Sequence, residues 1–279
     1  MRGACDKGRI VEQIVKALRP VAVLVAGIVV FVLGTAFALA ADATLASASG
    51  ASGALADAGR WLQFLGVAGA LGAVCLAGWA AVTRSAWVAA AEITAVALGA
   101  LLLTVGFLDS AASGGSSSAA PVTSAVGIGL WALLVLSRAA RANLAEQSAG
   151  SAVVQSDLWL GAAGGLFVLA IGYGITAAAD STAPGVAGGV LEAVGAGALT
   201  WAIYTARTRR MLDSKPVASV LAGLGLFAAS FLVGAVVAGL GFRTASALSI
   251  GLTVVTTVEL AAIVALGLAA WTRVAELYR

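Results

Sequence analysis

The chain has 279 residues, of which 61% are hydrophobic and only 10% are charged, with a formal net charge of +3. A soluble domain carries about 25% charged residues, so this composition excludes a chain with a water-covered surface. Histidine is absent, which excludes His-ligated haem, His-ligated zinc and histidine general bases. The mean hydropathy of +1.04 predicts an all-helical integral membrane protein, because the apolar residues form continuous blocks rather than the alternating segments of a β-barrel.

The N-terminal segment, residues 1–19, is a basic tail whose apolar residues have helical spacing. This pattern is typical of an amphipathic helix on the membrane surface or of a cytoplasmic extension of the first span, and we favour the extension. The following block imitates a secretory signal, with ALA at 38–40 as a cleavage sequence, so processing of residues 1–40 is the alternative. Because residues 21–41 exceed the about 7–15 residues of a signal core, we interpret them as a retained span.

Eight apolar blocks along the chain are long enough to cross a bilayer, for which a helix needs about 20 residues. The predicted spans are residues 20–41, 61–82, 86–108, 120–137, 158–179, 185–206, 216–241 and 246–271. The connections are short or rich in Ala, Ser and Gly, as in flexible linkers. We therefore expect no folded domain outside the membrane.

Basic residues collect on one side when the eight blocks are threaded up and down. That side receives the N-terminal tail and Arg84, Arg138, Arg141, Arg207, Arg209, Arg210, Lys215, Arg273 and Arg279. The other side receives Asp42, Asp57, Asp109 and Asp180, with only Arg60 and Arg243 as positive charges. Since cytoplasmic loops carry the excess of Lys and Arg, both termini are predicted to be cytoplasmic, and an even number of spans requires them to share a side.

Two stretches of the chain resemble each other. Residues 27–42 read GIVVFVLGTAFALAAD, and residues 165–180 read GLFVLAIGYGITAAAD, a shift of 138 positions (165 minus 27). Each stretch opens a set of four spans, so both sets start on the same side and form two parallel four-helix repeats. The predicted organisation is a tail at 1–19, a first unit at 20–141, a cytoplasmic linker at 142–156, and a second unit with a short cytoplasmic tail at 157–279.

Three carboxylates fall inside predicted spans: Glu92, Glu192 and Glu259. A charge at mid-membrane costs at least about 2.5 kcal/mol, so each acid is a candidate proton or cation site, in the order Glu259 (with Thr256 one turn before it), Glu192, Glu92. Small residues surround Glu192 at helical spacing, so we expect it to face protein rather than lipid. With no Lys or Arg expected at comparable depth, each acid is neutral or paired with water, hydroxyls or a cation; a neutral, hydrogen-bonded structural Glu is the alternative.

Asp42 and Asp180 end the two similar stretches on the outer side. An Asp at this point can simply end a membrane helix where water begins. The alternative is that the two aspartates line an outer vestibule of a transport path.

Two functional hypotheses follow. The first is a transporter or channel-like protein for a small solute or ion (H⁺ or Na⁺), with its site between the two repeats. The second is a non-catalytic membrane scaffold or accessory subunit of a larger membrane complex, because no soluble domain or polar pathway is evident.

Motifs of enzymes are missing: there is no Walker loop, no H-E-x-x-H and no G-x-S-x-G. We therefore expect no enzymatic activity, no cofactor and no metal site. The expected partners are the lipid bilayer and a membrane protein or second copy of the chain, not nucleic acid. The expected location is the cell (plasma or inner) membrane, with multiple spans.

Overall fold

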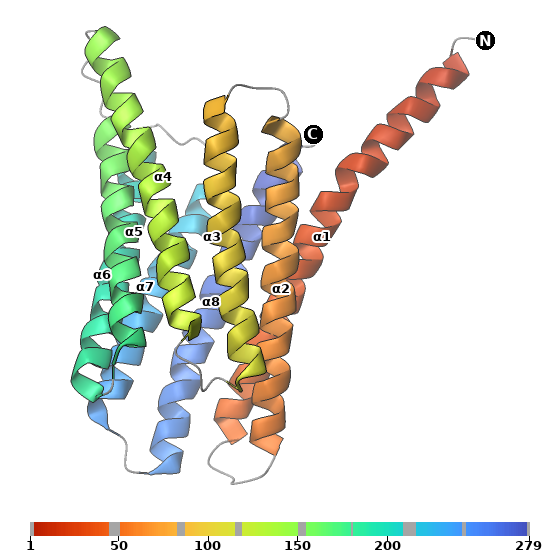
Figure 1. Cartoon of the computed structure of the whole chain (residues 1–279). Helices are drawn as coiled ribbons and strands as arrows, with labels where there is room; N and C mark the ends of the chain where they lie inside the picture. Colours follow the sequence, from red (N-terminus) through yellow and green to blue (C-terminus); the bar gives the residue numbers. More distant parts are fainter. Residues whose placement is uncertain are drawn as a thin grey trace.

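The computed structural model describes residues 3–44, 51–82, 87–114, 119–149, 155–179, 181–208, 216–241 and 244–277. These residues form eight α-helices (Figure 1), namely α1 (Gly3–Thr44), α2 (Ala51–Val82), α3 (Trp87–Ala112), α4 (Ala119–Ala149), α5 (Gln155–Ala177), α6 (Thr182–Thr208), α7 (Pro216–Leu240) and α8 (Ala245–Leu277). Helices satisfy every backbone polar group internally, as an apolar surrounding requires.

Seven of these helices are long and apolar enough to cross a membrane. Their apolar segments are Ala22–Thr44, Thr94–Ala112, Ala119–Arg141, Leu158–Ala177, Thr182–Thr208, Val217–Leu240 and Ala245–Ala269. The described residues of α2 do not include a segment that is both long and apolar enough to cross a membrane. The all-helical prediction is confirmed, and the chain is an apolar helical bundle of the kind that polytopic membrane proteins form.

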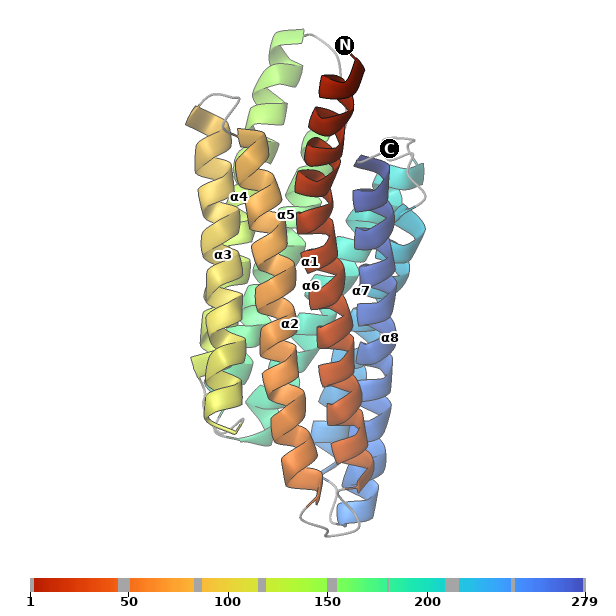
Figure 2. The same ribbon diagram turned by 90° about the vertical axis from the view of Figure 1, so that its right-hand side faces the viewer.

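The eight helices stand side by side as a closed ring (Figures 1 and 2). Each helix packs chiefly against the helix before it and the helix after it, and α8 packs against α1 to close the ring. The helices alternate in direction, so the start of α1 and the end of α8 lie at the same end of the bundle. The seams α4–α5 and α8–α1 are the places where the two predicted units meet.

Small residues fill the seams between helices, and large apolar residues face outward. The buried residues are mainly alanines with a few hydroxyl side chains, such as Ala132, Ala262 and Ser230 at 0% exposure. By contrast, Leu101 is 57% and Trp201 is 68% exposed. This distribution is typical of membrane helices, where small residues permit close packing and the outer apolar surface meets lipid.

Glycines bring α1 and α2 into backbone contact. A Cβ atom on Gly27 would lie 2.8 Å from the carbonyl oxygen of Gly66, and one on Gly34 would lie 2.8 Å from that of Gly59. A Cβ cannot be accommodated so close to a rigid backbone atom, so glycine at these positions sets the distance between the helices.

The same arrangement joins α5 and α6. A Cβ on Gly165 would lie 2.9 Å from the carbonyl oxygen of Gly195, and one on Gly172 would lie 2.9 Å from that of Gly188. The residue beside Gly172 on α6 is Glu192, as the residue beside Gly34 on α2 is Gln63.

From residue 3 onward, the basic segment is continuous with the first predicted span, because α1 runs unbroken from Gly3 to Thr44. The helix likewise continues past the predicted end of the fourth span, since α4 extends to Ala149 and takes in the first part of the predicted linker. Hydropathy marks where lipid ends, whereas hydrogen bonding allows a helix to continue into water.

Candidate functional site

Glu259 on α8 lies within electrostatic range of carboxylates on two other helices. Asp42 of α1 and Glu192 of α6 are the charged neighbours of Glu259 on α8. The hydroxyl of Tyr173 on α5 is in turn within electrostatic reach of Glu192 and Glu259. Since α6 and α8 are not neighbours in the ring, these acids act across its interior. Thus Asp42 and Glu192, which are far from Glu259 in the sequence, are both within electrostatic range of it.

Asp42 is tied to α8 near the end of α1. The Oγ1 hydroxyl of Thr256 donates a hydrogen bond to Asp42 Oδ2 at 2.6 Å, and the Oγ of Ser249 donates to the Asp42 backbone carbonyl. Thr256 and Ser249 are both buried, at 9% and 5% exposure. Asp42 therefore joins the end of α1 to α8.

Glu192 lies among small residues between α5 and α6. Its exposure is 6%, which confirms that it faces protein. The Oγ1 hydroxyl of Thr176 donates a hydrogen bond to Glu192 Oε1 at 2.8 Å, so at least one oxygen of the buried carboxyl group has a partner, as burial of a polar group demands.

Glu259 lies one helical turn beyond Thr256 on α8. Among the described residues it has no hydrogen bond or ion pair, and the Thr256 hydroxyl is engaged with Asp42. The described Arg side chains that form ion pairs do so with Asp57 and Glu92 instead. An acid so placed needs a proton or a bound cation to balance its charge.

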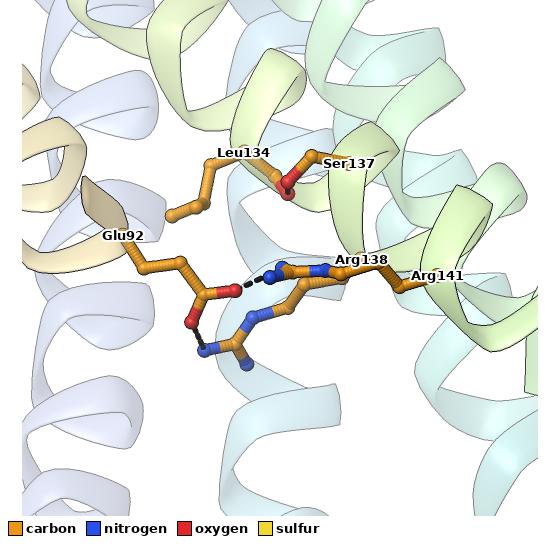
Figure 3. A network of polar contacts seen from close by, with 5 residues as sticks. All are labelled: Glu92, Leu134, Ser137, Arg138 and Arg141. Atoms are coloured by element: carbon orange, nitrogen blue, oxygen red, sulfur yellow. Dashed lines mark hydrogen bonds and ion pairs between the residues drawn. The ribbon is translucent and has the colours of Figure 1, made fainter. Parts of the chain in front are cut away.

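Glu92 belongs to a different site, at the start of α3 (Figure 3). Arg138 Nη2 donates to Glu92 Oε2 at 2.8 Å, and Arg141 Nη2 donates to Oε1. The expectation that this acid lacks a basic partner is wrong, because long Arg side chains reach back along their helix to a neighbour's acid. The hydrogen bond from Arg138, and then that from Arg141, hold the pKa of Glu92 below its ordinary value.

Arg138 also contacts a third helix, α5. The guanidinium carbon of Arg138 lies 5.8 Å from the ring centroid of Trp159 on α5, within range of a cation–π interaction. Arg138 thus links α3, α4 and α5, and the carboxylate of Glu92 is already neutralised. Asp180, the other predicted outer acid, lies outside the described residues.

Sequence reasoning did not select several polar residues of the interior. Gln63 Nε2 donates to Thr35 Oγ1 at 3.3 Å, and the Thr35 hydroxyl, 1% exposed, donates to the Phe31 carbonyl. Tyr173 makes an edge-on contact with Phe231 of α7, with ring centroids 6.0 Å apart. The sequence contains one indication of these two residues, because Thr35 and Tyr173 are polar residues at the same position of the two similar stretches.

An apolar cavity of about 450 Å³ lies inside the ring. Its walls come from α1, α2, α3, α7 and α8, and they consist of Leu24, Ile28, Phe31, Gly66, Val67, Ala70, Leu71, Leu103, Phe107, Phe227, Ile263, Leu266 and Gly267. The acids are not among the lining residues. Within the described part of the chain, no three Cys, Asp or Glu side chains lie close enough together to hold a metal ion.

Comparison with known proteins gave no match to a protein-family model, to a curated protein or to a solved structure.

Proposed function

We propose that this chain is a transporter or channel-like protein for H⁺ or Na⁺, with Glu259 as the principal ion-carrying residue. The observation that carries the proposal is the position of Glu259 inside the ring, with Asp42 and Glu192 as its charged neighbours and no hydrogen-bonding partner among the described residues. Charged groups in an apolar interior are costly unless compensated, and an exchangeable ion is the compensation that a transport site provides.

The three acids form a sequence of positions along which an ion can move. Asp42 and Thr256 join α1 to α8, while Glu192 and Thr176 join α6 to α5. Glu259 exchanges a proton or Na⁺ with either side, and Tyr173 contributes a hydroxyl to the same region. Relative motion of the two units at their seams gives alternating access.

We also propose that the ring consists of two parallel repeats with both termini in the cytoplasm of the cell membrane. The matched glycine contacts of α1–α2 and α5–α6 support the duplication. The common end of α1 and α8 in Figures 1 and 2 supports a shared side, and the excess of Lys and Arg favours the cytoplasm. The proposal assigns the chain no enzymatic activity.

Flux measurements on reconstituted protein test this function. The purified chain is placed in vesicles containing a trapped pH dye, and acid and ²²Na⁺ fluxes are recorded against empty vesicles. We expect flux from the natural chain, loss of flux in Glu259→Gln, and retention in Glu92→Gln, a matched carboxylate-to-amide control outside the interior. Absence of both fluxes, or full flux in a well-folded Glu259→Gln variant, would falsify the proposal.

A scaffold role is the second candidate, and a groove on the outer surface favours it. Between α6 and α7 lies a hollow of about 420 Å³, lined by Gly197, Thr200, Trp201, Tyr204, Leu221, Gly225 and Ala228. Small residues beside an exposed aromatic permit the close approach of another helix. Purification in mild detergent with a stoichiometric membrane partner, lost in Gly225→Leu, supports this role, and a single species without a partner contradicts it.

A further inference from the structure

The apolar cavity inside the ring is bounded at one end by polar groups. On α1, the lining residue Phe31 is followed one turn later by Thr35; on α2, Gln63 comes one turn before Gly66. Because residues three or four apart lie on the same face of a helix, these polar groups lie directly beyond the cavity wall. Their mutual hydrogen bond of 3.3 Å confirms that they face each other.

The same relation holds on α8, where the polar group is an acid. Glu259 comes one turn before the lining residue Ile263. Its charged neighbours are Asp42 and Glu192, so the polar end of the cavity is acidic. On the neighbouring helix α7, the lining residue Phe227 stacks on Phe231 with ring centroids 6.0 Å apart.

Aromatic rings connect the cavity with the acids. Phe231 contacts Tyr173 edge-on, and Tyr173 is the residue on which both Glu192 and Glu259 act. Inside the cavity itself, Phe31 and Phe107 meet edge-on at 5.5 Å between centroids. The interior thus has an apolar compartment with aromatic walls and, one helical turn away, an acidic compartment.

We propose that the cavity binds an organic cation with an apolar body, such as a hydrophobic amine, a quaternary ammonium or a phosphonium ion. The apolar groups occupy the cavity, and the positive charge lies toward the end of the cavity that is nearest Glu259. This inference rests on the proposed function, because it names a substrate class for the same acids.

Charge and shape both favour such an occupant over a neutral or anionic one. The described acids Asp42, Glu192 and Glu259 have no Arg or Lys contact, so a bound cation supplies their missing counter-charge, whereas an anion would be repelled. The rings of Phe31, Phe107 and Phe227 line the cavity, and aromatic rings attract cations. The volume of about 450 Å³ falls in the range of about 300–1,000 Å³ that small-molecule sites have.

Two probe ions of nearly the same shape and opposite charge test the proposal. Tetraphenylphosphonium and tetraphenylborate are each titrated into the purified, detergent-solubilised full chain, and binding is followed by equilibrium dialysis. We expect saturable binding of the phosphonium and none of the borate. Equal binding of both probes, or binding of neither, overturns the proposal.

Variants assign the binding to this cavity. Glu259→Gln is expected to weaken phosphonium affinity by at least about tenfold, because it removes one partner of a buried charge pair. Leu103→Trp fills the cavity and is expected to abolish binding, while Leu101→Trp, at a position 57% exposed on the same helix, is the matched control. Binding that survives both Glu259→Gln and Leu103→Trp refutes the site.

The flux and binding experiments separate the two proposals. Ion flux that depends on Glu259, without phosphonium binding, keeps the transport function and overturns the organic cation. A co-purified neutral lipid, detected by native mass spectrometry and not displaced by the phosphonium, also overturns it. Failure of both flux and binding removes both proposals together.

Discussion

The backbone contact between α1 and α2 at Gly66 allows a sharp test of how the ring is held together. A Cβ atom at this position would lie 2.4 Å from the backbone nitrogen of Phe31 and 2.7 Å from the carbonyl oxygen of Gly27. An ordinary contact needs a distance of at least 3.4 Å, so Gly66→Ala requires α1 and α2 to separate by about 1 Å. We therefore expect the substitution to destabilise the chain although it adds a single methyl group.

The control for this change is Gly72→Ala on the same helix, because a Cβ at Gly72 meets no atom within 4 Å. Overpacking costs about 1–3 kcal/mol, whereas Gly→Ala in an unobstructed helix interior gains about 0.5–1 kcal/mol. The two variants should therefore differ by about 1.5–4 kcal/mol. At about 2–4 °C per kcal/mol for a chain of this size, the expected gap in Tm is about 3–16 °C.

Thermal unfolding in detergent, followed by fluorescence-detected gel filtration, measures this gap. The corresponding pair on α6 is Gly195→Ala, where a Cβ would lie 2.7 Å from the Gly165 carbonyl oxygen, and Gly197→Ala, where a Cβ meets nothing within 4 Å. The α6 pair is expected to behave as the α2 pair does. Equal Tm values for Gly66→Ala and Gly72→Ala would refute the claim that backbone contact sets the α1–α2 distance.

Three further predictions concern the polar contacts. Glu92→Gln should lower the free energy of unfolding at neutral pH by about 1 kcal/mol, the scale of ion pairs at a surface. Because folding lowers the pKa of Glu92, the contribution of the ion pair is present above the ordinary pKa of 4.5 and is lost as the pH falls below that value. The Tm values of the natural chain and the variant should therefore converge in acid, and a Tm gap that does not depend on pH would contradict the ion pair. Thr256→Val should lower the free energy of unfolding by about 1–3 kcal/mol, because the partly buried carboxylate of Asp42 loses the hydrogen bond that the Thr256 hydroxyl donates. Hydrogen exchange at the end of α1 should become faster, and unchanged exchange would contradict the role of this hydrogen bond in joining α1 to α8. Tyr173→Phe keeps the ring contact with Phe231 and removes only the hydroxyl, so Tm should change by little while ion flux falls; unchanged flux would exclude the hydroxyl from the path.

Much of the fold was predictable because lipid imposes strong rules on sequence. The eight helices follow from continuous apolar blocks, and their alternation follows from short connections. The lengths of two helices were not predictable from hydropathy. Helix α1 begins at Gly3, within the basic N-terminal segment, and α4 continues past Arg141 to Ala149. In both places the helix persists after the apolar residues end, because its backbone hydrogen bonds do not depend on lipid.

The arrangement of neighbours was less accessible from the sequence. The closure of the ring by α1 and α8 depends on contacts between residues 214 positions apart, Asp42 and Thr256, and no local pattern encodes such a pairing. The small residues at helical spacing around Glu192 did indicate that it faces protein. The prediction that no Arg lies at the depth of Glu92 was wrong, because Arg138 and Arg141 reach this acid from α4.

The single-file packing of the ring has a consequence for how the protein is made. During synthesis, α1 emerges first and α8 last, so seven helices form an open arc before the final seam with α1 can close. Until then Asp42 lacks Thr256 and Ser249, and the inner face of the arc has no opposite wall. Of the eight helices, α8 therefore both closes the ring by its contact with α1 and carries Glu259 to the position where Asp42 is its neighbour.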